Sequence, residues 1–201
     1  MSLALILLVL GLVSGLARGG RLSNIGRAQF RYPGLVFAGL SLQIAAELAA
    51  AFVNPAFRQE NRGVAVLVAS YALLGAFVVV NRHVRGAAAI GTGLVLNIAV
   101  IAANGGMPVS VRALVVAGID PGDYLDRAVK HREMLPGTPL GLLGDVIPIP
   151  FLRAVVSLGD IVLALGIFRL VESLVRYDPR HRAPRTRPSP GGSDDSGAAG
   201  S

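Results

Sequence analysis

The segment GAAAIGTGLVLNIAVIAA, residues 86–103, contains no charged residue. A hydrocarbon core of about 30 Å needs roughly 20 apolar residues in a helix, so this segment comes close to a full crossing. Four further apolar blocks occur at about 3–17, 34–53, 64–80 and 158–175. In lipid every backbone polar group must be paired within the protein, which favours helices over strands. The sequence therefore predicts an all-α integral membrane protein with five transmembrane helices.

The composition of the chain is that of a membrane protein. Of its 201 residues, 53% are hydrophobic and 15% are charged, and the mean hydropathy is +0.61. A chain this apolar cannot present a polar face to water on every side and needs lipid as part of its solvent. Cysteine is absent, which excludes disulfides and thiolate chemistry.

The first block carries Gly11, Gly15 and Gly19 at four-residue spacing. Such a ridge lets a second helix approach closely, although glycine is common throughout this chain and the spacing alone does not require a partner. Gly15 and Ala17 also resemble a signal-peptide cleavage site. Arginines follow this block, however, and none precedes it, which is the reverse of a secretory signal. We therefore expect the first block to remain as a span.

The distribution of arginine predicts an orientation. Arginines gather in alternate connections and after the last block: Arg18, Arg21, Arg27 and Arg31; Arg82 and Arg85; Arg176, Arg180, Arg182, Arg185 and Arg187. The other connections are nearly neutral, which is the positive-inside pattern. We therefore predict a multi-pass membrane protein with its N-terminus outside and its C-terminus in the cytoplasm. The net charge of +7 follows from this pattern and gives no reason to expect a nucleic-acid partner.

The external segment, residues 104–157, is predicted to be partly helical. Ser110 is a good N-cap for a short helix over residues 111–117, which Gly118 would end. A second, more polar helix is expected within residues 120–135. Residues 141–152 are too apolar for a free loop and contain two prolines, so this stretch is expected either to lie in the membrane interface or to re-enter among the helices.

Residues 1–177 are predicted to form the membrane domain, and residues 178–201 a basic cytoplasmic tail. The tail is rich in Pro, Gly, Ser and charge and has nothing to bury, which predicts disorder. Its arginines are expected to rest on anionic lipid headgroups.

Several polar side chains fall at one depth in the predicted spans. Gln43 and Glu47 are four residues apart and share one helical face. At 1.5 Å per residue, Glu47 and Asn97 both lie roughly 9 Å below the outer boundary, and Ser70 and Tyr71 fall nearly level with them. We therefore predict an outward-facing polar pocket centred on Glu47. The alternative is that these groups only hydrogen-bond the helices together.

The remaining candidate residues have structural explanations. Ser157 and Asp160 form a capping-box pattern before an apolar run, so Asp160 is expected to cap the last helix. Asp145 is expected to be a turn residue. His131 has no second histidine at ligand spacing, so no metal site is predicted. No catalytic or phosphate-binding motif is present, and no cofactor is expected.

Three segments in order resemble a bacterial family of multi-pass membrane proteins defined by a domain of unknown function, family 5317. They are ANGGMPVS (103–110), LLGDVIPIP (142–150) and SLGDIVLALGIF (157–168), with RGGRL (18–22) after the first block. The resemblance covers residues 1 to about 177, with Leu158 where the family usually has a proline. It implies a multi-pass bacterial membrane protein and supplies no activity. It directs attention to residues expected together at the outer face: Asn104, Gly105, Gly106, Met107, Pro108, Asp145, Pro148 and Asp160.

Three functions fit these features. The first is a small-solute or ion binding or transport component whose pocket is closed by the external segment. Five spans are few for a complete transporter, so a homo-oligomer or a membrane partner protein would be expected. The second is a structural or assembly factor that docks another envelope protein through its external segment. The third, and least supported, is an intramembrane enzyme acting on a lipid-linked substrate, with Glu47, Asp145 or Asp160 as acid or base.

Overall fold

The structure is a computed structural model and describes residues 3–49, 61–127 and 131–177, without the side chains of residues 47, 61, 62, 64, 126 and 127. The chain is mostly helical, as predicted. Its elements are α1 (Leu3–Ala17), η1 (Leu22–Arg27), α2 (Gly34–Leu48), α3 (Asn61–Val80), α4 (Ala87–Asn104), β1 (Met107–Val109), α5 (Val111–Val116), α6 (Pro121–Arg127), β2 (His131–Glu133), η4 (Gly141–Leu143), β3 (Ile147–Ile149), η5 (Pro150–Leu152), β4 (Ala154–Val156) and α7 (Leu158–Val175). The predicted basic tail lies outside the described residues.

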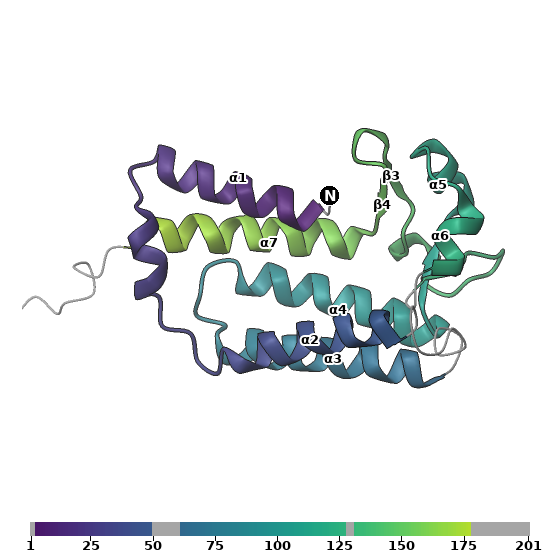
Figure 1. The fold of residues 1–201 in the computed structure, drawn as a ribbon, viewed down its shortest axis with the longest axis horizontal. Helices are drawn as coiled ribbons and strands as arrows, with labels where there is room; N and C mark the ends of the chain where they lie inside the picture. The colour runs from purple at the N-terminus through teal and green to yellow at the C-terminus, as the bar shows by residue number, and fades with distance from the viewer. Residues whose placement is uncertain (1–2, 50–60, 128–130, 178–201) are drawn as a thin grey trace, which may run out of the picture.

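Five long helices lie side by side, and helices α1, α7, α4, α3 and α2 pack against one another in that spatial order (Figure 1). The first and last helices of the chain are therefore neighbours. The connections 18–33 and 81–86, where most of the described arginines of the helical part occur, lie at one end of the bundle. Residues 105–157 form a cap of short elements at the other end (Figure 1).

Glycines set the close approach of α7 to its two neighbours. A Cβ on Gly11 would lie 2.6 Å from the carbonyl oxygen of Phe168, and one on Gly166 would lie 2.6 Å from the backbone nitrogen of Ile90. No side chain fits at such distances, so the backbones are in direct contact. The ridge predicted on the first helix is thus used against α7 at Gly11, whereas Gly19 has a φ of +83° and ends the helix instead.

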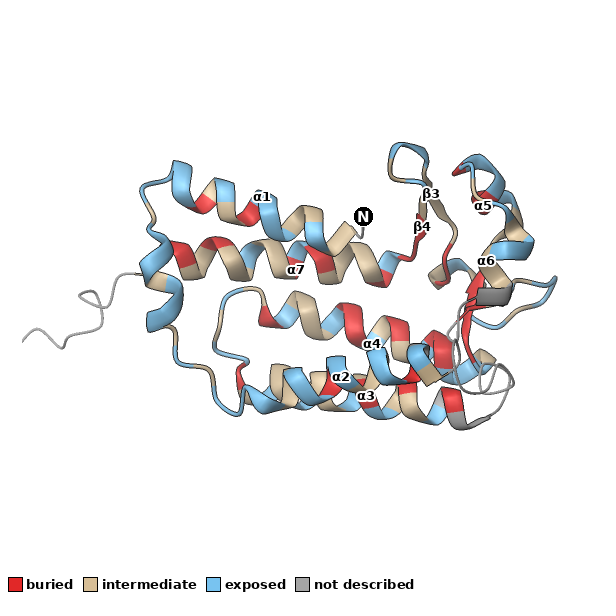
Figure 2. Ribbon diagram, viewed as in Figure 1, coloured by how far each residue is buried: buried red, intermediate tan, exposed pale blue. Residues whose placement is uncertain are grey.

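The bundle leaves many large apolar side chains uncovered (Figure 2). They occur on all five long helices: Leu5, Leu8, Val9, Leu10, Val13, Leu16, Phe37, Leu40, Ile44, Leu48, Val79, Val95, Leu158 and Leu165. Many of the fully buried side chains, by contrast, are at the cap end, where Val100, Ile101 and Met107 form one cluster and Val109, Leu114 and Ala117 belong to another. The apolar surface of the helices therefore faces outward as well as inward.

By length and apolar character, one described helix could cross a membrane: α4, with a mean hydropathy of 1.8. Three further apolar stretches are shorter: Leu3–Ala17 in α1, Gly34–Ala46 in α2 and Ala65–Val80 in α3. Helix α7 has 18 residues but includes Asp160, Arg169 and Glu172. The described helices thus support one candidate span rather than five, because α1 and α2 have 15 residues each and α7 carries three charged side chains. Residues 50–53 of the second predicted span lie outside the described residues.

The cap contains two small sheets that the sequence did not predict. Strand β1 pairs in parallel with β2, and β3 pairs antiparallel with β4. The all-α prediction is wrong for these residues, because three-residue strands are too short to show an alternating pattern. The second cap helix ends at Arg127, so β2 occupies residues that were predicted helical. The helix capped by Ser110 is confirmed, since the Ser110 side chain accepts from the Ala113 N–H.

Candidate functional site

Two of the three recognised motifs meet through their backbones in the cap. The N–H of Asp145 donates to the carbonyl of Pro108 over 2.9 Å, and the N–H of Ser110 donates to the carbonyl of Asp145 over 3.0 Å. Asp145 therefore lies beside β1, on the edge that β2 does not use. A Cβ on Gly144 would collide with the carbonyl oxygen of Pro108, so the glycine of this motif permits the close approach.

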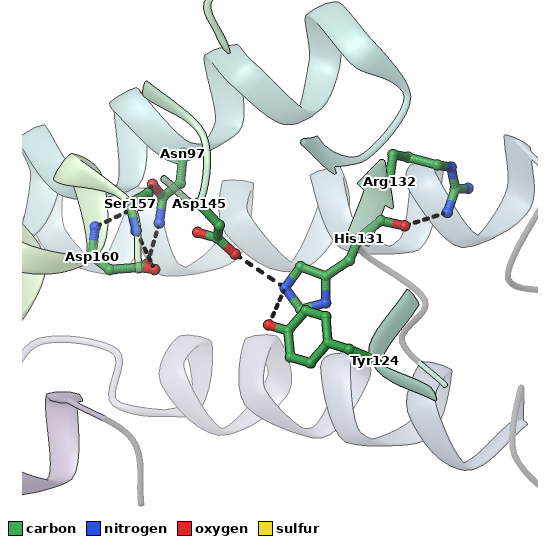
Figure 3. A network of polar contacts seen from close by, with 7 residues as sticks. All are labelled: Asn97, Tyr124, His131, Arg132, Asp145, Ser157 and Asp160. Atoms are coloured by element: carbon green, nitrogen blue, oxygen red, sulfur yellow. Dashed lines mark hydrogen bonds and ion pairs between the residues drawn. The ribbon is translucent and has the colours of Figure 1, made fainter. Parts of the chain in front are cut away.

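The Asp145 carboxylate is buried against a histidine and a tyrosine (Figure 3). Its Oδ2 lies 3.3 Å from Nε2 of His131, and the Tyr124 hydroxyl lies 3.3 Å from the same nitrogen. The two side chains of the Asp145–His131 pair are 4% and 8% exposed. The other carboxylate oxygen, Oδ1 of Asp145, has no hydrogen-bond partner among the described residues. Asp145 is thus a buried acceptor, and it lies in an isolated β-bridge with Val109 and not in the turn that was expected.

This cluster does not have the geometry of a proton relay. A relay through histidine uses one ring nitrogen for the carboxylate and the other for the reacting hydroxyl. Here Asp145 and Tyr124 both contact Nε2 of His131, and the imidazole is nearly closed to solvent. The contacts instead fasten α6 and β2 to the Asp145 segment. Sequence reasoning missed His131 because its partners are distant in the chain and were not predicted to be neighbours.

A second polar network joins the cap to the bundle (Figure 3). Asn97 on α4 donates from Nδ2 to Oδ1 of Asp160 over 2.7 Å, and the Ser157 hydroxyl donates to Oδ1 of Asn97 over 3.0 Å. Ser157 and Asp160 form the predicted capping box at the start of α7, which is confirmed. Asn97 is 1% exposed and Ser157 is fully buried. The third motif is therefore tied to α4 by hydrogen bonds to a capping carboxylate.

The NGG sequence ends α4 and links it to the cap. Gly105 adopts a left-handed φ of 64°, and the Gly106 N–H reaches back to the carbonyl of Ile101 over 3.1 Å. This is the Schellman arrangement, for which glycine at the left-handed position is preferred. The Asn104 side chain donates to the carbonyls of Val100 and Pro139, at 2.8 and 2.9 Å. Met107 and Pro108 then enter β1 fully buried.

The predicted polar layer is divided between separate contacts in the described residues. Gln43 donates to the hydroxyl of Ser70 over 3.0 Å, which joins α2 to α3. Asn97 instead bonds to α7, and Tyr71 packs against the cluster around Ile101. The Glu47 side chain, on which the predicted pocket was centred, lies outside the described residues.

A further carboxylate is buried at the opposite end of the bundle. Glu172 on α7 is 6% exposed and accepts from the hydroxyl of Ser14 over 3.1 Å. Arg18 donates to the same oxygen over 2.7 Å from a side chain that is 60% exposed. These contacts join the basic end of α1 to α7. Within the part of the chain that the structure describes, no three acidic, histidine or cysteine side chains are grouped to hold a metal ion.

A family of unknown function (DUF5317) matches residues 27–172. No curated protein and no solved structure matches the chain. The matched range contains all three motifs and every side chain of the Asp145 and Asp160 networks, whereas helix α1 lies outside it.

Proposed function

Since this chain belongs to the DUF5317 family, whose function is unknown, we propose from its own geometry that it is a scaffold of the bacterial plasma membrane. In this proposal five helices cross the bilayer, and the cap (residues 105–157) stands outside the cytoplasm and docks another envelope protein. The observation that carries the docking function is a group of exposed leucines on residues 134–142 of the cap.

The membrane part of the proposal is supported by the uncovered apolar surface of the bundle. Every long helix carries at least one exposed leucine or valine, with most of them on α1 and α2, and only 33% of the α4 window is buried. A core helix of a water-soluble protein would be mostly buried, and large exposed apolar patches on such proteins are rare. Lipid is the solvent that covers such a surface on all sides.

Charge supports the orientation. The arginines of the connections 18–33 and 81–86 lie at the end of the bundle opposite the cap (Figure 1). The positive-inside rule assigns that end to the cytoplasm and the cap to the outer face. Glu172 does not alter this balance, because Arg18 pairs with it at the same end.

Helix length limits how the five helices can cross. At 1.5 Å per residue, α4 spans about 27 Å and α1 about 22 Å, against a hydrocarbon core of about 30 Å. Shorter helices are accommodated when the bilayer thins locally and flanking arginines reach to the headgroups. We therefore propose that the bilayer is thinner around α1 than around α4.

The docking part is supported by the distal segment, residues 134–142. Leu135, Leu140 and Leu142 are 62%, 48% and 89% exposed. The Asn104 side chain bonds to the Pro139 carbonyl, so this segment lies beyond the end of α4, and Figure 1 shows the loop that follows β2 at the cap end of the molecule. A bilayer around the flanks of the helices does not reach this position. The cap is joined to the bundle by the hydrogen bond that Ser157 donates to Asn97 and by the one that Asn104 donates to the Pro139 carbonyl, so this surface is held at a set height above the membrane. A second protein is the partner that such a surface fits.

Single cysteines test the orientation, because the chain has none of its own. Leu135→Cys is expected to react in intact cells with a maleimide that cannot cross the membrane. Arg85→Cys, in a basic connection, is expected to react only after the cells are permeabilised. Labelling of Arg85→Cys in intact cells, or protection of Leu135→Cys until lysis, would contradict the proposal.

A photo-crosslinking side chain tests docking. Placed at Leu142 in native membranes, it is expected to give one discrete adduct with another envelope protein, whereas the same group at the exposed Asp123 gives none. The adduct is expected to disappear when Leu135 and Leu140 are both changed to serine. Adducts with a second copy of the chain alone, or equal labelling from both positions, would contradict docking of a different protein.

One observation favours the second candidate function, binding of a small cation or polar solute from outside. Oδ1 of Asp145 is buried and has no hydrogen-bond partner among the described residues, and a buried acceptor of this kind is a place where a ligand can bind. Under this alternative, Asp145→Asn abolishes ligand-dependent thermal stabilisation. Under the docking proposal, the same change leaves the Leu142 adduct in place.

A further inference from the structure

The β3–β4 hairpin carries an apolar tip that is largely exposed. Strand β3 pairs with β4 in the register Ile149↔Ala154, so residues 150–153 form the tip. Pro150 is exposed, Phe151 is 85% exposed, and Arg153 closes the turn with a left-handed φ of 48°. The sequence VIPIPFLRAVVS, residues 146–157, contains no acidic residue, and Arg153 is its one charge.

We propose that this tip is an interfacial anchor, with Phe151 inserted at the boundary between headgroups and acyl chains of the outer leaflet. The inference rests on the membrane placement proposed above and adds the partner of this surface. It also decides between two expectations for residues 141–152, because an exposed Phe151 on a paired hairpin favours the interface over re-entry among the helices.

The position of the hairpin supports lipid as the occupant. Strand β4 leads through Ser157 directly into α7, so Phe151 is held within about 23 Å of the outer end of that helix, at 3.3 Å per strand residue. Figure 1 shows the hairpin extending sideways from α7, on the same side as α1. Leu5 and Leu8 of α1 are themselves exposed on the proposed lipid-facing surface. The tip therefore reaches sideways at the level where the headgroups of the outer leaflet begin.

Helix α5 contributes to the same surface. The Arg153 guanidinium donates from Nη2 to the carbonyl of Gly118 over 2.8 Å, which joins the hairpin to the end of α5. Val115 and Val116, near that end, are 62% and 52% exposed. The Arg153 guanidinium has further N–H donors beside these apolar groups. An apolar side chain such as Phe151 can therefore enter the interface while the neighbouring Arg153 donates to lipid phosphates.

A single tryptophan tests the anchor, because the chain contains none. The full chain with Phe151→Trp is reconstituted in vesicles of phosphatidylcholine and phosphatidylglycerol, with bromine at a shallow or a deep acyl position. Blue-shifted emission is expected, with a larger loss of intensity from the shallow bromine than from the deep one. Leu135→Trp is the matched control on the cap and is expected to show water-like emission and little quenching.

Val13→Trp separates failure of the anchor from failure of the membrane placement. Val13 lies on α1 and is 55% exposed, so the placement predicts strong quenching of its tryptophan by the deep bromine. Quenching of Val13→Trp without quenching of Phe151→Trp would overturn the anchor alone. Blue-shifted emission of Phe151→Trp that no bromine quenches would also overturn it, because a second copy of the chain would then cover the tip. Unquenched Val13→Trp would overturn the membrane placement itself.

Discussion

Removal of the Asn97 side chain tests the hydrogen bonds that join α4 to the start of α7 and to Ser157 at the end of the cap. Asn97→Ala deletes a donor to the Asp160 carboxylate at 2.7 Å and an acceptor for the Ser157 hydroxyl at 3.0 Å. A hydrogen bond to a charged group contributes about 1.5–3 kcal/mol and a neutral one about 1 kcal/mol, although interhelical bonds measured in a membrane protein average nearer 0.6 kcal/mol. Because Asn97 is 1% exposed, water cannot replace the lost partners. We expect Asn97→Ala to lower the free energy of unfolding by about 2–4 kcal/mol.

The assay is reversible unfolding in detergent micelles, followed by circular dichroism, for the wild type and each variant. Thr92→Ala is the control on the same helix, because the exposed Thr92 hydroxyl bonds only to the Ala88 carbonyl, and we expect a change within about 0.5 kcal/mol. A double-mutant cycle with Asp160→Asn is expected to give a coupling energy above about 1 kcal/mol. Additive effects of the two changes, or equal losses from the Asn97 and Thr92 variants, would refute the proposed link.

Three further changes test other contacts by the same unfolding measurement. Gly159→Ala places a Cβ on the Asn97 amide and is expected to lower the free energy of unfolding by about 1–3 kcal/mol. Gly75→Ala meets no neighbour and is expected to leave the free energy of unfolding unchanged or to raise it. Equal effects of the two changes would contradict the packing described for α4 and α7. His131→Ala leaves the buried Asp145 carboxylate without its imidazole partner and is expected to lower the free energy of unfolding by about 2 kcal/mol. Adding Asp145→Asn is expected to restore most of this loss. A double variant that is no more stable than His131→Ala would show that the pair is not coupled. Arg18→Ala removes an ion pair whose arginine is 60% exposed and is expected to cost less than about 1 kcal/mol, so a larger loss would mean that the pair is shielded from solvent.

Local signals in the sequence predicted the helices and their caps well. Ser110 and the Ser157–Asp160 box each act within three or four residues of their own position, and the structure places both caps as expected. The family resemblance also pointed to segments that meet, since Asp145 bonds to the backbone beside Pro108. These features depend on neighbours in the sequence or on motifs, both of which are visible in a single chain.

Contacts between distant segments could not be predicted in the same way. The pairing of Asp145 with His131 requires the β1–β2 sheet and the bridge of Asp145 to Val109, and these strands are three residues long and carry no periodicity. Equal depth in the membrane suggested that Asn97 and Ser70 belong to one layer, but depth does not specify which way each helix face points. Asn97 faces α7 and Ser70 faces α2, so the two contribute to different contacts.

The contact between α1 and α7 also bears on how the protein is made. Helix α1 leaves the ribosome before α7, yet the contact at Gly11 is complete only when α7 has followed, and 140 residues lie between Ala17 and Leu158. At about 5–20 residues per second, translation of that interval takes roughly ten seconds or more. During this time α1 lacks the contact that α7 provides at Gly11, so the packing of α7 between α1 and α4 forms only after most of the described chain has been synthesised.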